Sequence, residues 1–476
     1  MRSVFILFYS FLFTALISAQ DSLLIQGEKY KVDTIVPRHD VGLGTMATQY
    51  RLPGIPLVVS VLEIDVSNPY VDVMSVLSHD SLGGFEPSSG MARRKSSEEH
   101  EVLGGVNADF FTGTGHPVNG QILKGQVAKE PDPERPLMAF DGKKQPFLDR
   151  MSFEGSVTIG EETMSLDGVN TNREDDQLIF FNQYYGSTTS ADEPGIEVVV
   201  ELSEGDWKVN QPLTCTVKKI REHSDKAALS PGKAVLSGHG TSAELLRYLE
   251  ENDELEIEFN VSMASVDSVN PALEEMVGGD RIMLDSGKVV DNNWAELHPR
   301  TGAGFSRDKS KVILTVVDGR DEPVSIGVTT SQLAEIMKLS GAWWAINLDG
   351  GGSSTMMVRD SILNSPSDGA ERKVANALFF ASAAPQGEAV DFKLNADHLT
   401  VPAGQKITVK ASTFDKYGDV VSYLDAPGVT YSVDGDIGTI NDRGEFVASG
   451  KGEGMITGKW KGKKDTVQVM VVTAAD

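Results

Sequence analysis

Apolar positions along the first half of the chain predict mainly strands, separated by short polar turns. Leu57–Ile64 is an almost continuous apolar run, which is typical of a buried strand, and Tyr70–Met74 alternates between apolar and polar residues. Further strands are expected at Ile196–Val200 and Leu255–Phe259. A helix is predicted over Thr241–Glu250, because its first four residues have the spacing of a capping box. This part of the chain is therefore expected to be rich in β-structure.

In the segment from 311 to 348, the spacing of apolar residues changes most clearly from that of a strand to that of a helix and back. Lys311–Val317 is predicted to be an apolar strand, and Ala342–Leu348 is predicted to be the next one. Between them a helix should open at Thr329, with Gln332 completing a capping box, and stop at Gly341. Strand, helix and strand with short joins predict a parallel βαβ unit. The expected fold class is an α+β or α/β mixed-sheet catalytic domain containing this unit.

Two aspartates follow these strands directly. Asp318 and Asp349 should emerge at the same edge of the sheet, outside which ligands bind in such folds. Asp349 is followed by three glycines, 350 to 352, whose backbone can approach a ligand closely and form an anion-binding nest. The alternative is a tight turn that Asp349 caps. We favour a functional loop.

Two further clusters contain residue types that suit a charged sugar ligand. Arg300 offers a planar fork for phosphate oxygens and Thr301 adds a hydroxyl, although a surface salt bridge would explain the arginine as well. Asn107 could hydrogen-bond a sugar or a phosphate, and Asp109 is either a catalytic carboxylate or a turn cap. His116 lies in a glycine-rich loop, where exposure to solvent is the more common role.

The remaining candidates are less specific. Arg372, in a loop before the strand Val374–Phe380, is a second possible phosphate clamp. The glycine-flanked hairpin from 278 to 287 is expected to be structural. No Cys/His cluster suggests zinc, and no cofactor is predicted, although Asp and Glu oxygens leave a calcium ion open.

Composition and charge narrow the functional classes. The net charge of −26 repels nucleic acids, so no nucleic-acid partner is expected. Residues 1–19 have the pattern of a signal peptide, which predicts a secreted, periplasmic or cell-surface protein, and no other stretch suggests a membrane span. Cys215 is the only cysteine, so no intrachain disulfide can form, and it is expected to be a small core hydrophobe.

The character of the chain changes near residue 388. From 391 to 476 short strands alternate with turns and show no helical period, which predicts a small β-sandwich. The expected organisation is a signal peptide at 1–19, a lead-in region with strands at 20–100, a catalytic domain at 101–385 and this sandwich at 391–476. The stretch from 429 to 440 resembles a bacterial Ig-like domain, which implies an all-β Ig-like tail.

Several segments between about 102 and 380 resemble, in their order, the phosphodiester glycosidase family. They are Val106–Phe111, Gly238–Thr241, Gly278–Gly279, Pro299–Thr301, Val317–Gly319, Asn347–Thr355, and Pro366–Asp368 with Arg372. The resemblance implies hydrolysis of the anomeric C–O bond of a sugar 1-phosphodiester, with an N-acetylglucosamine-like sugar, releasing the sugar and a phosphomonoester. The substrate could be carried on a cell-surface or host glycan. Family members often have glycine where this chain has Asp109.

On this basis we expect a site with two kinds of residue. The catalytic candidates are Asp349, Asp318 and Asp109. The substrate-binding candidates are Asn107, His116, Arg300, Thr301, Gly350, Gly351, Ser353, Ser354 and Arg372. Two other classes of function stay open at this point. One is a phosphodiesterase or an ordinary O-glycosidase, and the other is a non-enzymatic surface glycan-binding protein.

Overall fold

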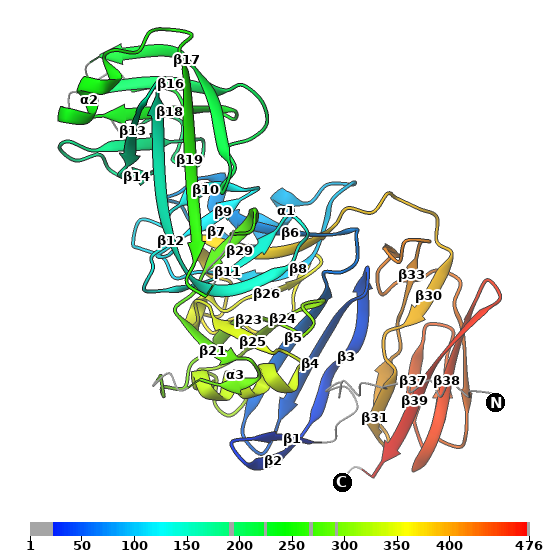
Figure 1. Cartoon of the computed structure of the whole chain (residues 1–476). Helices are drawn as coiled ribbons and strands as arrows, with labels where there is room; N and C mark the ends of the chain where they lie inside the picture. Colours follow the sequence, from blue (N-terminus) through cyan, green and yellow to red (C-terminus); the bar gives the residue numbers. More distant parts are fainter. Residues whose placement is uncertain (1–21, 190–194, 223–225, 266–269, 291–293, 474–476) are drawn as a thin grey trace, which may run out of the picture.

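The computed structural model describes residues 22–189, 195–222, 226–265, 270–290 and 294–473. The predicted signal peptide at 1–19 lies outside these residues. Figure 1 shows a central body, a lobe of long strands that extends away from it, and a C-terminal region packed beside the body. Within the described ranges, no helix has the length and apolar character needed to cross a membrane.

Antiparallel sheets dominate the fold, so the expected α+β or α/β class is wrong. The described residues contain three short α-helices: α1 (Ser88–Lys95), α2 (Gly240–Leu246) and α3 (Thr330–Leu339). The body contains an eight-stranded sheet. In spatial order its strands are β22 (Lys288–Val289), β21 (Arg281–Asp285), β25 (Trp344–Asn347), β23 (Arg300–Phe305), β24 (Lys311–Val317), β5 (Leu57–Asp65), β4 (Thr45–Leu52) and β3 (Asp33–Gly42).

The parallel βαβ unit is also wrong, although its three elements exist. β24, α3 and β25 follow one another along the chain, but β23 lies between the two strands and pairs antiparallel with both. Local periodicity cannot reveal a third strand that enters the gap from earlier in the chain. Since β24 and β25 are each antiparallel to β23, they run in the same direction. Their ends, followed by Asp318 and Asp349, therefore lie at one edge of the sheet.

A second, five-stranded sheet faces the first across the main core of the body. Its strands are β27 (Ser361–Ile362), β26 (Met356–Val358), β8 (Glu101–Asn107), β29 (Asn376–Ser382) and β6 (Val71–Leu77). Apolar side chains from both sheets, such as Leu62, Leu314 and Phe380, belong to the same buried cluster. The region from 20 to 100 thus supplies strands to both sheets. Two small pairs complete the body: β1 (Ser22–Ile25) with β2 (Glu28–Lys31), and β7 (Glu86–Pro87) with β28 (Lys373–Val374).

Helix α3 covers the outer face of the eight-stranded sheet. Its capping box is present as predicted, since Thr329 accepts from the Gln332 N–H and the Gln332 side chain accepts from the Thr329 N–H. Leu333, Ile336 and Met337 are fully buried in the cluster beneath it. The helical period in this segment was therefore a reliable guide to both its boundaries and its buried face.

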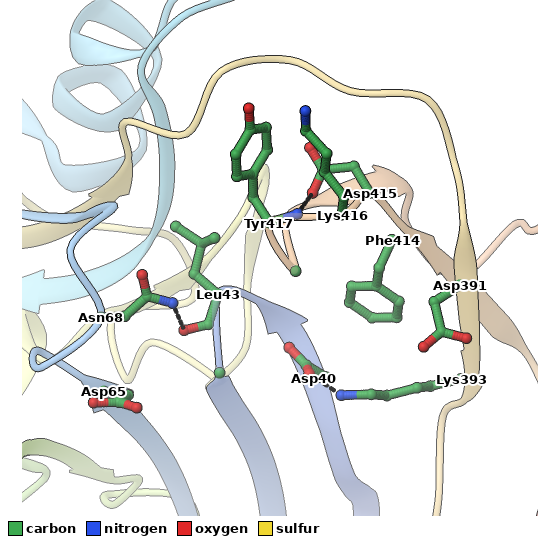
Figure 2. Close-up of a pocket in the computed structure, with 12 residues that line it drawn as sticks. Asp40, Leu43, Asp65, Asn68, Asp391, Lys393, Phe414, Asp415, Lys416 and Tyr417 are labelled. Atoms are coloured by element: carbon green, nitrogen blue, oxygen red, sulfur yellow. Dashed lines mark hydrogen bonds and ion pairs between the residues drawn. The ribbon is translucent and has the colours of Figure 1, made fainter.

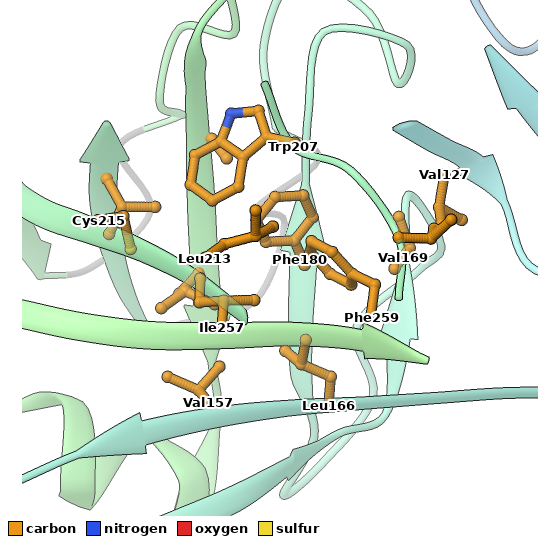
Figure 3. Packing of buried hydrophobic residues seen from close by; sticks show 14 of the residues in the cluster. Val127, Val157, Leu166, Val169, Phe180, Trp207, Leu213, Cys215, Ile257 and Phe259 are labelled. Atoms are coloured by element: carbon orange, nitrogen blue, oxygen red, sulfur yellow. The ribbon is translucent and has the colours of Figure 1, made fainter. Parts of the chain in front are cut away.

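A third sheet links the body to the lobe. Its strands are β10 (Gln126–Lys129), β9 (Gln121–Leu123), β20 (Leu273–Gly278), β11 (Pro136–Asp141), β12 (Pro146–Ile159), β19 (Glu254–Met263), β17 (Pro212–Glu222), β16 (Ile196–Leu202), β18 (Lys233–Gly238), β15 (Leu178–Phe181) and β14 (Gly168–Val169), with β13 (Glu162–Leu166) on β12. β12 and β19 run out of the body side by side (Figure 1). The lobe has its own aromatic core, which includes Phe180, Trp207 and Phe259 (Figure 3).

Two sequence predictions concern this lobe. Cys215 is fully buried in its core, as expected, and burial raises the pKa of its thiol to about 12. The capping box expected at Thr241 is wrong. Helix α2 begins at Gly240 after His239 and ends at Leu246, without a side-chain cap. The Thr241 hydroxyl instead donates to Asp176 Oδ1 at 3.3 Å, a partner that its own sequence neighbourhood does not reveal.

The C-terminal region is all β. One sheet has the strand order β30 (Asp391–Leu394), β33 (Ala411–Phe414) and β34 (Val420–Ser422). Another has the order β31 (His398–Pro402), β39 (Lys463–Val472), β38 (Gly452–Trp460) and β35 (Thr430–Asp434). A further sheet has the order β32 (Lys406–Thr408), β37 (Glu445–Ala448) and β36 (Gly438–Ile440). A separate apolar cluster fills it. Its Ig-like character and the domain boundaries stay predictions.

The C-terminal region contacts the body through specific polar pairs, which we call the junction. Lys393 Nζ lies 2.5 Å from Asp40 Oδ2, and His39 Nε2 lies 2.8 Å from the Tyr423 hydroxyl. The Leu43 N–H donates to the Gly418 carbonyl at 2.8 Å. A cavity of about 390 Å³ opens at this junction, lined by residues from both parts (Figure 2).

Candidate active site

The ends of β8 and β25 meet at one edge of the body. The Asp349 N–H donates to the Ala108 carbonyl at 2.8 Å, and Asn107 Nδ2 donates to the Asp349 carbonyl at 2.7 Å. Asp109 follows Ala108 directly. Two of the three catalytic candidates, Asp109 and Asp349, therefore leave the backbone at neighbouring positions, although they are 240 residues apart in sequence. We call this place the strand-end edge.

Asn107 and Thr301 hold this edge together. Asn107 Oδ1 accepts from the Thr301 hydroxyl at 2.9 Å and from the Thr355 N–H at 3.1 Å. Both side chains are fully buried. They were predicted to bind substrate, but the structure shows their polar atoms engaged with the protein, joining β8, β23 and the loop after Asp349.

Asp349 is half-buried at the head of the glycine loop. Burial raises the pKa of its carboxyl to about 6, and the nearby Asp280 charge acts in the same direction. Ser353, the Gly350 N–H and Arg372 favour the ionised form and limit the rise. At neutral pH Asp349 is therefore mainly a carboxylate, as a base or nucleophile must be.

Asp109 is more deeply buried, with 1% of its surface exposed. Its Oδ2 accepts from the Asn119 N–H at 2.6 Å, whereas no partner within the described ranges donates to Oδ1. Burial raises the pKa of Asp109 to about 7, so the protonated form is well populated near neutrality. Burial thus raises the pKa values of both Asp109 and Asp349, and carboxyls with raised pKa values are candidates for acid–base chemistry.

Asp318 is held in a different way. Its carboxylate accepts from the Ser365 N–H at 3.1 Å and from Asn364 Nδ2 at 3.1 Å. Asn364 also donates to the Ser354 carbonyl, so Asp318 connects its strand end to the far side of the glycine loop. Burial raises the pKa of Asp318 to about 6. Its oxygens are occupied by protein donors, which suits a positioning role.

The glycine loop is tightly packed. The Gly351 N–H donates to the Pro299 carbonyl at 2.8 Å, and the N–H groups of Ser353 and Ser354 turn back onto Gly350 and Gly351. Most of the donors expected in an anion nest are thus used within the protein. Gly351 has φ +63, and a Cβ there would lie 2.9 Å from the Arg320 guanidinium. A Cβ at position 352 would contact the ends of the Arg372 and Asp368 side chains, so these two side chains would have to move to admit a larger residue there.

The predicted phosphate-binding arginines both have protein partners. Arg300 is 1% exposed, and it donates through Nε to the Val328 carbonyl at 2.7 Å and through Nη2 to the Glu296 carbonyl at 2.9 Å. Burial lowers its pKa to about 10. Arg372, above Gly352, donates twice to Asp368 Oδ2.

His116 lies in the loop after Phe111 and contacts Thr114 Oγ1 at 3.0 Å. Burial and the neighbouring Lys129 charge lower its pKa. It is therefore neutral at pH 7, and it lies close to Lys129 on the Asp109 side of the edge.

Sequence reasoning missed the aromatic and charged residues that connect these elements. The Trp294 ring lies under two guanidinium groups, 4.4 Å from that of Arg300 and 4.7 Å from that of Arg281. The Phe110 ring is stacked 6.3 Å from Trp294. Asp280 accepts from Asn347 Nδ2 at 2.7 Å and from Arg281. Asp280 and Arg281 directly follow the Gly278–Gly279 pair, which was the one available signal, and they lie in the hairpin expected to be structural.

The described residues contain no group of three or more His, Cys, Asp and Glu side chains arranged to hold a metal ion. The junction cavity of Figure 2 and a second cavity of about 390 Å³, lined by Arg173–Asp175 and His239 in the lobe, are not lined by residues of the strand-end edge.

With this geometry in view, the similarities to known proteins become informative. Residues 209–381 match the phosphodiester glycosidase family. This confirms the resemblance expected from the motifs. The matched segment contains Arg300, Thr301, Asp318, the glycine loop with Asp349, and Arg372, while Asn107, Asp109 and His116 precede it.

Similarity to individual proteins is more distant. An 88-residue stretch is 41% identical to the SPbeta prophage-derived uncharacterized protein YomE of Bacillus subtilis (strain 168), covering 18% of this chain and only 13% of that protein. Solved structures share the fold. A hypothetical protein from Synechocystis has a TM-score of 0.54 at 17% identity, over 71% of this chain and 62% of that one.

Two other solved structures are similar. A protein from Burkholderia pseudomallei K96243 described as exported has a TM-score of 0.51 at 22% identity, over 68% of this chain and 74% of that one. The catalytic domain of zebrafish N-acetylglucosamine-1-phosphodiester alpha-N-acetylglucosaminidase, auto-inhibited by its pro-peptide, has a TM-score of 0.37 at 13% identity, over 73% and 87% of the respective chains.

Proposed function

We propose that this protein hydrolyses the anomeric C–O bond of a sugar 1-phosphodiester, with an N-acetylglucosamine-like sugar, and releases the sugar and a phosphomonoester. The observation that carries the proposal is that the backbone of Ala108, which precedes Asp109, bonds to that of Asp349 at the strand-end edge, at the head of a loop inside the matched segment. The family match supports the reaction class. Glycoside hydrolysis uses two carboxyls, and the neighbouring backbone positions of Asp109 and Asp349 support the proposal.

The two aspartates have different catalytic roles in this proposal. Asp349, with a pKa of about 6, is the carboxylate that stabilises the oxocarbenium-like transition state or attacks the anomeric carbon. Asp109, with a pKa of about 7, is the proton donor or acceptor near neutrality. A phosphomonoester is a stable leaving anion, so the stabilisation of its charge matters more than strong protonation.

The loop and its supports fix this arrangement. Asn107 and Thr301 hold the backbone on one side of Asp349, and Asp318 holds the loop from the other through Asn364. We assign a positioning role to these three residues. Export from the cell, an Ig-like C-terminal domain and a substrate on a cell-surface or host glycan belong to the same proposal and rest on the sequence alone.

The test is a panel of sugar 1-phosphodiesters and matched simple glycosides, assayed with the purified chain in ¹⁸O-labelled water. The proposal expects turnover of phosphodiesters and the label in the released sugar. Label in the phosphate would instead indicate a phosphodiesterase. Equal turnover of simple glycosides would indicate an ordinary O-glycosidase, and sugar binding without turnover would indicate a glycan-binding protein.

A further inference from the structure

Arg135 has a guanidinium group whose N–H donors are only partly provided with acceptors by the described residues around it. It lies just before β11, and its side chain is 25% exposed. Its Nε and Nη2 atoms are nevertheless buried, and no hydrogen-bond acceptor for them is found in the part of the chain that the structure describes. Its nearest charged neighbour is Asp109, whose Oδ1 lies 3.8 Å from Nη2, beyond hydrogen-bond distance.

The atoms of Arg135 and Asp109 that lack hydrogen-bond partners lie near each other. Asp109 Oδ1 is the carboxylate oxygen for which the described residues provide no donor, and the Asp109 side chain is wholly shielded from solvent. Buried polar atoms without partners cost free energy, and they are uncommon in native proteins. The two groups form an ion pair at 3.8 Å, but neither Nη2 nor Oδ1 has a hydrogen bond among the described residues, so each can still bond to a third polar group.

Two cationic side chains lie near Asp109. Lys129 is close enough to Asp109 and Arg135 for its pKa to respond to both, so two cations surround one buried carboxyl. Lys129 donates to the Val118 carbonyl at 2.9 Å, which leaves the Arg135 fork as the less occupied donor. Glu130 and Asp132 also lie near Lys129 and act on its pKa in the same direction as Asp109, so a ligand is indicated by the open donors of Arg135 and not by a net positive charge.

Aromatic contacts connect Arg135 to the rest of the strand-end edge. Its guanidinium carbon lies 5.7 Å from the centre of the Phe110 ring, Phe110 stacks on Trp294, and Trp294 lies against Arg300. The Arg300 and Arg372 guanidinium groups are bonded to protein acceptors, as described above. Arg135 is the arginine of this edge that combines a buried fork with open donors.

We propose that Arg135 binds the phosphate group of the substrate through Nε and Nη2, beside Asp109, and is thus a substrate-binding residue that precedes the segment of the family match. The Nε–Nη2 fork has the geometry that suits two oxygens of one phosphate. A phosphodiester bound there brings its negative charge next to Asp109 and favours the protonated form of that carboxyl. The inference rests on the proposed function for its choice of phosphodiester, but phosphate binding can be measured without any turnover.

The experiment compares Arg135→Gln, Arg135→Lys and the wild-type full-length chain. Arg247→Gln, an exposed arginine of the lobe, is the charge-matched control. Binding of inorganic phosphate is measured by calorimetry, and kcat and KM are measured with a sugar 1-phosphodiester. We expect Arg135→Gln to raise both the phosphate Kd and the KM by about 10- to 100-fold, the range for one lost charge-assisted interaction. Arg135→Lys should recover part of the affinity, and Arg247→Gln should match the wild type.

The outcomes separate the two proposals. If the wild type binds phosphate and Arg135→Gln does not, but no phosphodiester is hydrolysed, the Arg135 site stands and the proposed function falls. If phosphodiesters are hydrolysed and Arg135→Gln keeps both the phosphate Kd and the KM within twofold, the Arg135 site is overturned. A wild-type chain that neither binds phosphate nor turns over overturns both. Thermal unfolding of each variant checks that it is folded. If Arg135→Gln does not fold, Arg135→Lys is used for the comparison in its place.

Discussion

Buried charge is treated in opposite ways at the junction and at the strand-end edge. At the junction, Asp40 is 8% exposed and accepts from the Gly42 N–H at 2.9 Å and from Lys393 at 2.5 Å. At the strand-end edge, Asp109 is more deeply buried, yet one of its oxygens has no donor among the described residues and the nearest arginine stands 3.8 Å away.

The difference shows what each region is built for. Fully partnered charges at the junction specify how the C-terminal region sits against the body. Incompletely partnered carboxyls with raised pKa values cost stability, and they persist where a ligand supplies the missing contacts. The comparison therefore predicts that substitutions of Asp109 and Asp349 change chemistry more than stability, and that substitutions at the junction do the reverse.

The largest effect is expected for Asp349→Asn. Loss of the carboxylate charge beside the reacting carbon should lower kcat by about a hundredfold to ten-thousandfold, while thermal unfolding stays close to that of the wild type. Asp360→Asn, an exposed aspartate in the turn before β27, is the matched control and should leave kcat unchanged. Activity within threefold of the wild type in Asp349→Asn would remove this residue from the mechanism.

Asp109→Asn should lower kcat/KM by about a hundredfold and should also change its pH profile. If Asp109 acts as the acid, the active form is protonated, so activity should fall as the pH rises through about 7. Asp349 must be ionised, so activity should rise with pH through about 6. The wild type is therefore expected to show a narrow bell between these values, and Asp109→Asn should lose only its alkaline limb. An alkaline limb that persists in the variant would assign it to another group.

The sequence revealed the local structure around the site better than its long-range organisation. The limits of α3, its cap and its buried face follow from a helical period and a Thr–Gln pair that lie close together in the chain. The placement of β23 between β24 and β25 depends on contacts that no local pattern encodes, so a parallel unit was inferred where the sheet is antiparallel. The same limit explains α2, where Thr241 bonds to Asp176 from another segment.

For the site, the sequence indicated which residues lie at the edge more readily than it indicated their hydrogen-bond partners. Asp349 was identified by its position after a strand and Asp109 by its place in the motif around Asn107, and both lie at the edge. Arg300 has the expected identity but is held by two backbone carbonyls, which only the folded chain brings to it. Arg135 had no motif, because its importance comes from the donors it leaves open and from its distance to Asp109.

A smaller effect is expected for Asp318→Asn, which compares two aspartates that follow parallel-running strands. The amide would place an N–H group against donors from Ser365 and Asn364, so the free energy of unfolding should fall by about 1–2 kcal/mol. The glycine loop would loosen, and kcat should fall less than tenfold. Urea unfolding measures the change in the free energy of unfolding, and steady-state kinetics measures the change in kcat. A loss of activity as large as that of Asp349→Asn, with unchanged stability, would make Asp318 a catalytic residue after all.

The smallest effect on chemistry is expected at the junction itself. Lys393→Met removes the cation that pairs with Asp40, and this should lower the free energy of unfolding by about 1 kcal/mol, because the lysine is half-exposed while its partner is buried. Lys410→Met, at an exposed position of the same region, is the control for loss of a positive charge. Both variants should keep the wild-type kcat and KM, since the junction residues are not those that line the strand-end edge. A tenfold fall in kcat in Lys393→Met alone would mean that the orientation of the C-terminal region shapes the site, and the two regions could then no longer be treated as independent.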